Sequence, residues 1–349
     1  MSVRVQLSAL VTLSADVSST LQRAVALSTA GIDIIGVAEA YGVDAVSLLG
    51  YLAARTERIQ LMSQILPLFS RSPALTAMTA AGLDLVSGGR FILGLGASGP
   101  QVVEGWHGVP YTAPVGRTRE VIEICRSAWR RERLSYKGRY YRLPLPEGEG
   151  TGLGKPLKLV AHPARERIPV YLAALGTKNV QLAAEVAEGW IPTLFMPEHA
   201  HAVWGASLAR GQQKRDPRLG GLEIVAGAPL AIGAGLGELR NHARRRLALY
   251  VGGMGAKGAN FYNDLVTRYG FAREAELVQD LYLRGDKREA AAALPQALVD
   301  GMSLVGDEGF VRERARAFLA AGVTVLQVDP VGSDPLGDVR KLRMIVDSL

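Results

Sequence analysis

The sequence FILGLGASGPQVVEGWHGVP, residues 91–110, decides between two common α/β folds in which a strand runs into a glycine turn. Its apolar start at 91–95 is typical of a buried strand, and three glycines fit the dinucleotide-binding spacing G-x-G-x-x-G: Gly94, Gly96 and Gly99. That fingerprint also requires a long helix to begin at the third glycine. Pro100 and the broken sequence after it predict no helix there, and we expect the next one near Arg117. The glycines therefore indicate a turn that brings backbone close to a flat, phosphorylated ligand outside a Rossmann fold.

Short apolar runs alternate with amphipathic helical stretches from one end of the chain to the other. This alternation is typical of repeated βα units that build a parallel sheet. Eight candidate strands can be counted, at 3–7, 32–37, 59–65, 91–95, 168–173, 189–193, 223–232 and 323–328. We therefore predict an α/β fold of the (β/α)8 TIM-barrel type, in one domain over residues 1–349.

The ends of several helices can be placed from capping residues. Asp44, Ser72 with Pro73, and Asp307 precede helical stretches, and Ala-Gly pairs at 30–31 and 321–322 end helices just before a strand. Two insertions interrupt the alternation, after strand four at about 134–165 and after strand seven at about 251–305. The first begins as a hairpin that turns at Lys137 and Gly138.

The composition narrows the class of protein. Hydrophobic residues make up 48% and charged residues 21% of the 349 residues, which is typical of a globular protein with a large core. The net charge of +7 is spread along the chain, which fits an anionic small ligand, and no nucleic-acid motif or membrane-spanning run is present. Cys125 is the only cysteine, so we expect no internal disulfide and a reducing, cytoplasmic location.

Five blocks of the sequence resemble the luciferase-like family, and within it the coenzyme F420-dependent oxidoreductases. They are EAYGVDA (39–45), LAARTERIQL (52–61), RSPALTAM (71–78), SGGRFILGLGASGPQVVEGWHGVPY (87–111) and IPVYLAALGTKNVQLAAEVAEGWIPTLFMP (168–197). The resemblance implies a TIM barrel that holds a deazaflavin, or alternatively the flavin FMN, at the C-terminal mouth of its strands. It also implies a homodimer.

The resemblance places cofactor-binding residues on the loops after strands two to five. They are Glu39 after strand two; Gln64 and Ile65 after strand three, joined by a non-proline cis peptide; Gly96, Ala97, Ser98 and Gly99 after strand four; and Leu175, Gly176, Thr177, Lys178 and Asn179 after strand five. The residues themselves support the last group, because a helix that begins near Thr177 offers free N–H groups and a positive dipole end to a phosphate. Other roles stay open: Glu39 or Thr177 could cap a helix, and Lys178 could be solvated.

The sequence departs from better-defined branches of the family at the proton-transfer positions. Ala40 and Gly99 stand where the sugar-phosphate and alcohol dehydrogenase branches carry a histidine and a glutamate. We therefore expect reduction of a C=C or C=N bond in a small organic substrate, with the catalytic proton donor unassigned: water, Tyr41 or Glu104, with Glu39 a further candidate. No metal site is expected, since the few histidines match no zinc motif.

Two other functions remain open at this point. An FMN-dependent luciferase-like monooxygenase would use the same barrel and loops, and a barrel that binds a ligand without catalysis would explain the missing histidine and glutamate. We expect the two insertions to set the substrate specificity at the mouth.

Overall fold

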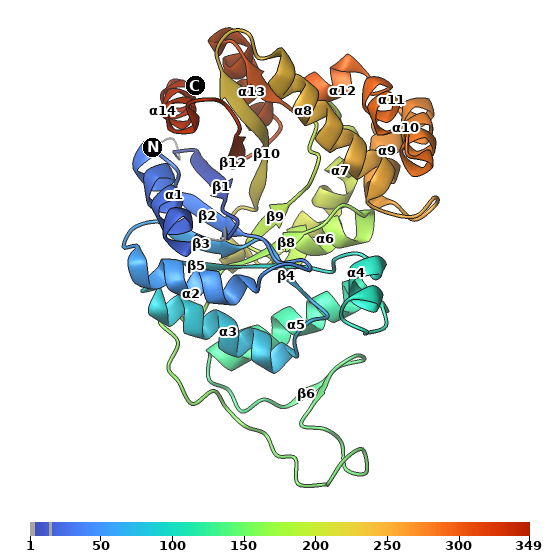
Figure 1. Cartoon of the computed structure of the whole chain (residues 1–349). Helices are drawn as coiled ribbons and strands as arrows, with labels where there is room; N and C mark the ends of the chain where they lie inside the picture. The colour runs from blue at the N-terminus through green and yellow to red at the C-terminus, as the bar shows by residue number, and fades with distance from the viewer. Residues whose placement is uncertain (1–3, 14–15) are drawn as a thin grey trace.

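The computed structural model describes residues 4–13 and 16–349, and its centre is a closed ring of eight parallel strands (Figure 1). In chain order the barrel strands are β1 (Gln6–Leu10), β2 (Ile34–Val37), β3 (Gln60–Ser63), β5 (Phe91–Gly96), β8 (Val170–Ala173), β9 (Gly189–Ile191), β10 (Glu223–Ile232) and β12 (Val325–Pro330). Pairing of β10 with both β9 and β12 closes the ring. The predicted (β/α)8 barrel is confirmed.

Two short strands accompany the ring. β4 (Leu66–Pro67) pairs with the end of β5, and β11 (Leu304–Gly306), which the sequence did not predict, pairs with the outer half of β10. Seven of the predicted barrel strands overlap the observed ones closely. The first was predicted at 3–7 but lies three residues later, and Val3 is outside the described residues. The register with β12 sets the true position, because Gln6 pairs with Val325 and Ala9 with Val328.

One inward-facing residue from each of seven strands builds a layer inside the barrel: Ile34, Met62, Ile92, Tyr171, Ile191, Val225 and Val325. On the eighth strand Ser8 pairs in register with Ile34, and it is 1% exposed. This layer fills the barrel in the way expected of a TIM barrel, so open space remains only toward the strand ends.

The outer helices are α1 (Val17–Ala30), α2 (Ala45–Arg55), α3 (Pro73–Val86), α4 (Pro100–Gly105), α5 (Pro114–Trp129), α6 (Thr177–Val186), α7 (Pro197–Gln212), α8 (Gly237–Ala248), α13 (Glu308–Ala320) and α14 (Pro335–Asp347). Their caps are largely those predicted. The side chains of Asp44, Ser72 and Asp307 accept hydrogen bonds from the first turns of α2, α3 and α13. Gly31 and Gly322 have positive φ angles of 118° and 93°, as helix-ending glycines should.

The prediction for the stretch after β5 was partly wrong. Gly99 is the N-cap of α4, so a helix does begin at the third glycine, and α5 begins at Pro114 rather than near Arg117. α4 has only six residues, and the strand before it belongs to a closed barrel. The match to a dinucleotide fingerprint therefore still indicates no Rossmann site.

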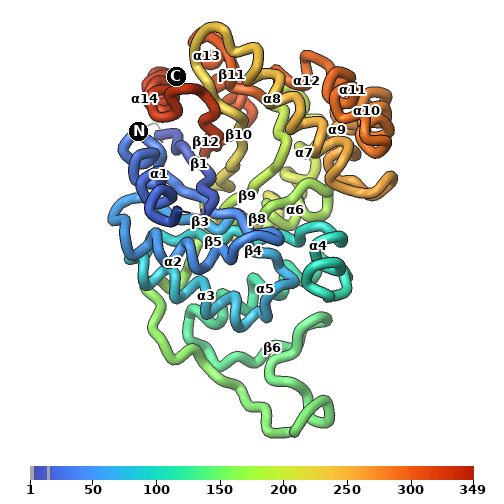
Figure 2. Tube along the Cα trace, viewed as in Figure 1, coloured from blue at the N-terminus to red at the C-terminus, as the bar shows by residue number. Residues whose placement is uncertain are grey.

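The first insertion forms the predicted hairpin, between β6 (Tyr136–Lys137) and β7 (Arg142–Leu143). The Glu120 carboxylate on α5 holds the hairpin by accepting hydrogen bonds from the backbone N–H groups of Arg139, Tyr140 and Tyr141, at 2.8–3.0 Å. The rest of the segment runs to β8 as a long excursion that projects away from the barrel (Figure 2).

The second insertion is helical and follows α8. It contains a π-helical turn at Leu249–Gly253, labelled η2, and helices α9 (Phe261–Arg268), α10 (Ala272–Arg284), α11 (Lys287–Ala292) and α12 (Gln296–Gly301). Gly253, Gly255 and Gly258 also fit the spacing G-x-G-x-x-G, but a helix rather than a strand precedes them, so they indicate no dinucleotide site. Assignment of the whole chain to one domain stays a prediction.

Gly94 on β5 is a position where the barrel has no room for a side chain. A Cβ atom there would lie 1.8 Å from the carbonyl oxygen of Ser63 on β3. We expect Gly94→Ala to lower the free energy of unfolding by about 3 kcal/mol or to prevent folding. Gly82→Ala is the control, because a Cβ atom on this α3 residue meets nothing within 4 Å. It should raise the free energy of unfolding by about 0.5–1 kcal/mol, since alanine is the better helix former. Urea titrations compare them, and equal stability of the two variants would contradict this account of β3–β5 packing.

Candidate active site

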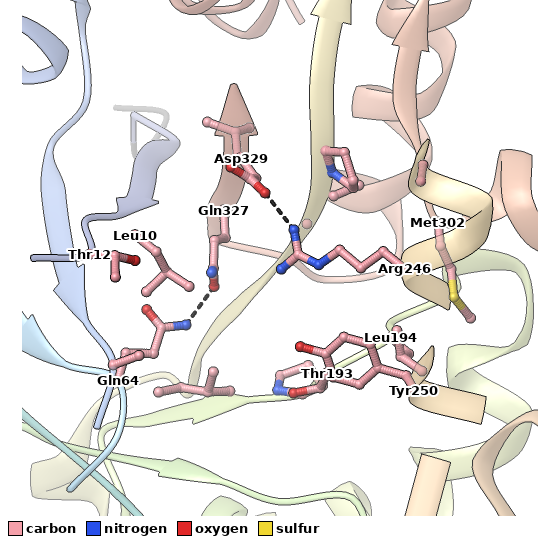
Figure 3. A pocket seen from close by; sticks show the side chains of 18 of the residues that line it. Leu10, Thr12, Gln64, Thr193, Leu194, Arg246, Tyr250, Met302, Gln327 and Asp329 are labelled. Atoms are coloured by element: carbon pink, nitrogen blue, oxygen red, sulfur yellow. Dashed lines mark hydrogen bonds and ion pairs between the residues drawn. The ribbon is translucent and has the colours of Figure 1, made fainter. Parts of the chain in front are cut away.

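A cavity of about 1010 Å³ opens where the barrel strands end (Figure 3). Its wall is formed by residues of β1, β8, β9, β10 and β12, by residues just after β2 and β3, and by α1, α8, the π-helical turn and α12. The C-terminal ends of the strands are where TIM-barrel enzymes carry their sites. Its polar lining includes Arg23, Gln64, Arg246, Tyr250, Gln327 and Asp329.

Gln64 and Ile65 form one wall of this cavity, and their contact with a cofactor stays a prediction. The peptide bond between them is cis and involves no proline, which confirms the carry-over from the family. The Gln64 amide donates from Nε2 to Oε1 of Gln327 at 2.6 Å, so the ends of β3 and β12 are linked across the cavity floor. Gly36 on β2 makes room for this side chain, since a Cβ atom there would lie 2.5 Å from Gln64 Oε1.

Gly96 lies against protein side chains on the side where a Cβ atom would stand. A Cβ atom on Gly96 would lie 2.9 Å from Ile65 Cδ1 and 3.3 Å from Ala173 Cβ. The glycine therefore accommodates the Ile65 side chain, and the space beside it is filled by protein. Gly96 and the three residues after it do not line the cavity. Their contact with a cofactor stays a prediction.

The loop after β5 is closed by bonds of its own. Ser98 has a positive φ of 60°, and its carbonyl accepts a hydrogen bond from the Tyr111 hydroxyl at 3.3 Å. The Glu104 carboxylate accepts from the backbone N–H of Tyr111 at 3.1 Å. Glu104 thus holds the loop and lies outside the cavity lining. Tyr41, which is 64% exposed, also lies outside the lining.

The start of α6 is the place where a phosphate site was predicted, and phosphate binding there stays a prediction. Gly176 is the N-cap, no side chain caps the helix, and a Cβ atom on Gly176 would meet nothing within 4 Å. Thr177 is the first helical residue rather than the cap, so the capping alternative is wrong. Within the described chain no hydrogen bond to a protein acceptor involves the N–H groups of Thr177, Lys178 or Asn179. Leu175 lies just before them, where its carbonyl accepts from Trp204 Nε1 at 3.0 Å.

Glu39 is engaged by protein groups. Its carboxylate forms a two-pronged ion pair with Arg71, at 2.6 and 2.9 Å, and accepts from the first backbone N–H of α2, that of Ala45, at 3.0 Å. Its side chain is 10% exposed and that of Arg71 13%. The hydrogen bonds that Arg71 donates to Glu39, with the negative charges of Glu39 and Asp44, raise the pKa of Arg71 above its ordinary value despite burial. The structure thus gives Glu39 the helix-capping role; contact with a cofactor ring stays a prediction.

Sequence reasoning missed the charged residues on the opposite wall. Arg246 extends from α8 into the cavity and forms an ion pair with Asp329 at the end of β12, beside Tyr250 of the π-helical turn (Figure 3). Burial alone would lower the pKa of Arg246, but Tyr250 and Asp329 raise it above the ordinary value. The strand-end rule applied to strand eight would have found Asp329, whereas no local pattern marks Arg246.

The two insertions contribute unequally to the cavity. Val299 and Met302 of the second insertion line it, but no residue of 134–165 does. The expectation that both insertions shape the mouth is therefore wrong for the first one, which attaches to the outer face of α5.

Neither a metal centre nor a membrane span emerges from the part of the chain that the structure describes. Residues 4–13 and 16–349 hold no group of three or more His, Cys, Asp or Glu residues placed to bind a metal, and no helix long and apolar enough to cross a membrane. The cytoplasmic location stays a prediction.

Comparison with known proteins identifies the family. The model of the luciferase-like monooxygenase family matches residues 2–325. The chain belongs to this family. It is 42% identical over 322 residues to a protein of Mycobacterium tuberculosis named as a coenzyme F420-dependent oxidoreductase, with 91% of this chain and 92% of the relative covered. It is 30% identical over 298 residues to the 5,10-methylenetetrahydromethanopterin reductase of Archaeoglobus fulgidus, with 82% of each covered.

Solved structures agree with the fold of this luciferase-like chain. The coenzyme F420-dependent tetrahydromethanopterin reductase of Methanopyrus kandleri superposes with a TM-score of 0.80 over 99% of both chains, at 19% identity. Within the luciferase-like family, the similarity is thus to the F420-dependent branch that the sequence blocks indicated.

Substitution of Glu39 distinguishes its structural role, capping α2 and pairing with Arg71, from contact with the cofactor. We expect Glu39→Gln to lower the free energy of unfolding by about 1–3 kcal/mol, because it removes one charge of a mostly buried pair. Glu57→Gln, on an exposed glutamate, should change it by less than about 0.5 kcal/mol. Chemical denaturation measures both. Unchanged stability together with a large loss of F420 affinity would instead assign Glu39 to the cofactor.

Proposed function

We propose that this protein is an F420-dependent oxidoreductase that works as a reductase on a C=C or C=N bond of a small organic substrate. The observation that carries the proposal is that the predicted cofactor rim and the large cavity share one boundary. Gln64, Ile65 and Ala173 line the cavity, and Ala173 pairs in register with Gly96. A cofactor on that rim would therefore face a space large enough for a second molecule.

The residues of this rim suit a phosphorylated deazaflavin. The uncapped start of α6 and the exposed Lys178 would hold a phosphate, and the backbone at Gln64 and Ile65 would lie against the ring. The net charge of +7 suits an anionic cofactor. The names of similar proteins point the same way, since the M. tuberculosis relative is named as F420-dependent.

When bound in its reduced form, coenzyme F420 supplies a hydride. The chain's own part is to position the substrate, exclude water and provide a proton. Ala40 is exposed and Gly99 caps α4, so neither replaces the acid or base groups of the dehydrogenase branches. The groups that line the cavity and could hold a proton there are Tyr250 and Asp329. The missing histidine and glutamate, at Ala40 and Gly99, support reduction of C=C or C=N over oxidation of an alcohol.

Lys178 provides the test of cofactor choice. We expect the protein to retain F420 more tightly than FMN, and Lys178→Ala to raise the Kd for F420 about three- to tenfold by removing a charge at the phosphate. Lys155→Ala, on an exposed lysine of the first insertion, should leave the Kd unchanged. Fluorescence titration of desalted protein measures each Kd.

The outcomes separate the competing functions. Tight FMN binding with no F420 retention, and oxygen consumption with reduced FMN, would replace this proposal with the monooxygenase. Retention of F420 without turnover over a panel of enones and imines would favour a barrel that binds without catalysis.

We also propose a homodimer, in which the outer face of α3 packs against a second copy. Four large apolar side chains are exposed on this helix, Leu75, Met78, Leu85 and Val86, at 44–56%. An apolar face of this kind commonly marks a protein interface. We expect Met78→Asp to give a monomer by analytical ultracentrifugation, whereas Met344→Asp, on α14 and 66% exposed, should leave the wild-type dimer intact. A monomeric wild-type protein would contradict the proposal.

A further inference from the structure

The cavity has a second half that the proposed cofactor does not explain. Its walls are the ends of β9, β10, β12 and β1, with α8, the π-helical turn and α12 above them. Most of this lining is apolar and includes Leu10, Ile191, Leu194, Leu247, Val299 and Met302. A molecule that fills this half therefore needs an apolar body.

Three charged residues line the cavity: Arg23, Arg246 and Asp329. They leave a net charge of about +1, because the two cations face one carboxylate. Among the residues that the structure describes, Arg23 has no ion pair. The charges of the lining are thus balanced by one further negative charge.

The pair between Arg246 and Asp329 is open to the cavity. Their side chains are 43% and 46% exposed, so both are solvated, and an exposed pair of this kind contributes only about 0–1 kcal/mol to stability. Arg246 Nη1 bonds to Asp329, and the side chain projects between Asp329 and Tyr250 into the open space (Figure 3). The guanidinium fork has five donors, so it can bind a second carboxylate in place of Asp329 or beside it.

We propose that the substrate of this protein is an apolar monocarboxylic acid whose carboxylate binds Arg246, with Arg23 adding to the positive field. The assignment of this acid as substrate rests on the proposed function, whereas its binding does not. A monoanion fits better than a phosphate dianion, because it balances the lining and meets less repulsion from Asp329. Asp329 holds Arg246 until the acid binds, so it acts as an internal competitor for the guanidinium.

The test is direct binding without F420, with trans-cinnamate and trans-cinnamamide as the two probes. They share one apolar body and differ in charge. Isothermal titration calorimetry should show cinnamate binding to the wild-type protein, and Arg246→Gln should weaken it about tenfold or more while changing cinnamamide less than about twofold. Arg245→Gln is the matched control, since Arg245 is the neighbouring exposed arginine on α8 and lies outside the cavity lining.

Asp329→Asn provides a second test, because loss of a merely structural ion pair would not increase the affinity for cinnamate. It removes the competitor and should tighten cinnamate binding several-fold without tightening cinnamamide. Circular dichroism confirms that each variant is folded, and Arg246→Lys, which keeps the charge without the fork, replaces Arg246→Gln if the latter is unfolded; it should also weaken cinnamate.

The proposal would be overturned if the wild-type protein bound no cinnamate, or if Arg246→Gln weakened the binding of acid and amide equally. It would also be overturned if Arg245→Gln weakened cinnamate binding as much as Arg246→Gln, or if Asp329→Asn weakened cinnamate binding. The cofactor titration is independent. Binding of cinnamate through Arg246 by a protein that retains no F420 would leave the acid site in place and reject the proposed reductase. Retention of F420 by a protein that does not bind cinnamate would reject the acid site and leave the proposed reductase in place.

Discussion

The site depends on how three glycines surround the end of strand β3. Gly36 on β2 leaves room for the Gln64 side chain, Gly94 on β5 for the carbonyl of Ser63, and Gly96 for the Ile65 side chain. Any larger residue at these positions would push the flanking strands away from β3. Because barrel closure fixes the spacing of the strands, the glycines let Gln64 and Ile65 turn into the cavity. Small residues on neighbouring strands thus determine which side chains reach the mouth.

This packing explains how far the sequence could predict the fold. Alternating apolar runs and helix caps are local signals, and they located the barrel and most of its helix ends. The start of β1 depends on register with β12, more than 300 residues away, so no local pattern could place it. The short α4 was missed because Pro100, read as a helix breaker, is also favoured in the first turn of a helix.

The sequence predicted more of the cofactor rim than of the opposite cavity wall, which carries Arg246 and Asp329. The family resemblance alone placed Gln64 and Ile65, whereas the residues themselves also indicated a helix that begins near Thr177, where α6 starts. Gly96 was predicted to contact a cofactor, and the structure adds that it lies against Ile65 and Ala173. On the opposite side, Arg246 and Asp329 come from segments 83 residues apart. A lone arginine in a basic helix carries no local sign that it faces a cavity, so tertiary packing alone reveals it.

The second insertion connects the fold to the cavity wall that carries Arg246. The Asn260 side-chain amide donates to the carbonyls of Tyr250 and Val251, at 3.1 and 3.0 Å, and caps α9 with its oxygen. The insertion thereby holds the π-helical turn that places Tyr250 beside Arg246, and π-helical turns of this kind often occur at functional sites. The cofactor rim, in contrast, is built from barrel strands and their glycines. We therefore expect changes in the insertion to alter the wall that carries Arg246 while the rim stays constant, since the insertion supplies Val299 and Met302 to the lining and none of the predicted rim residues.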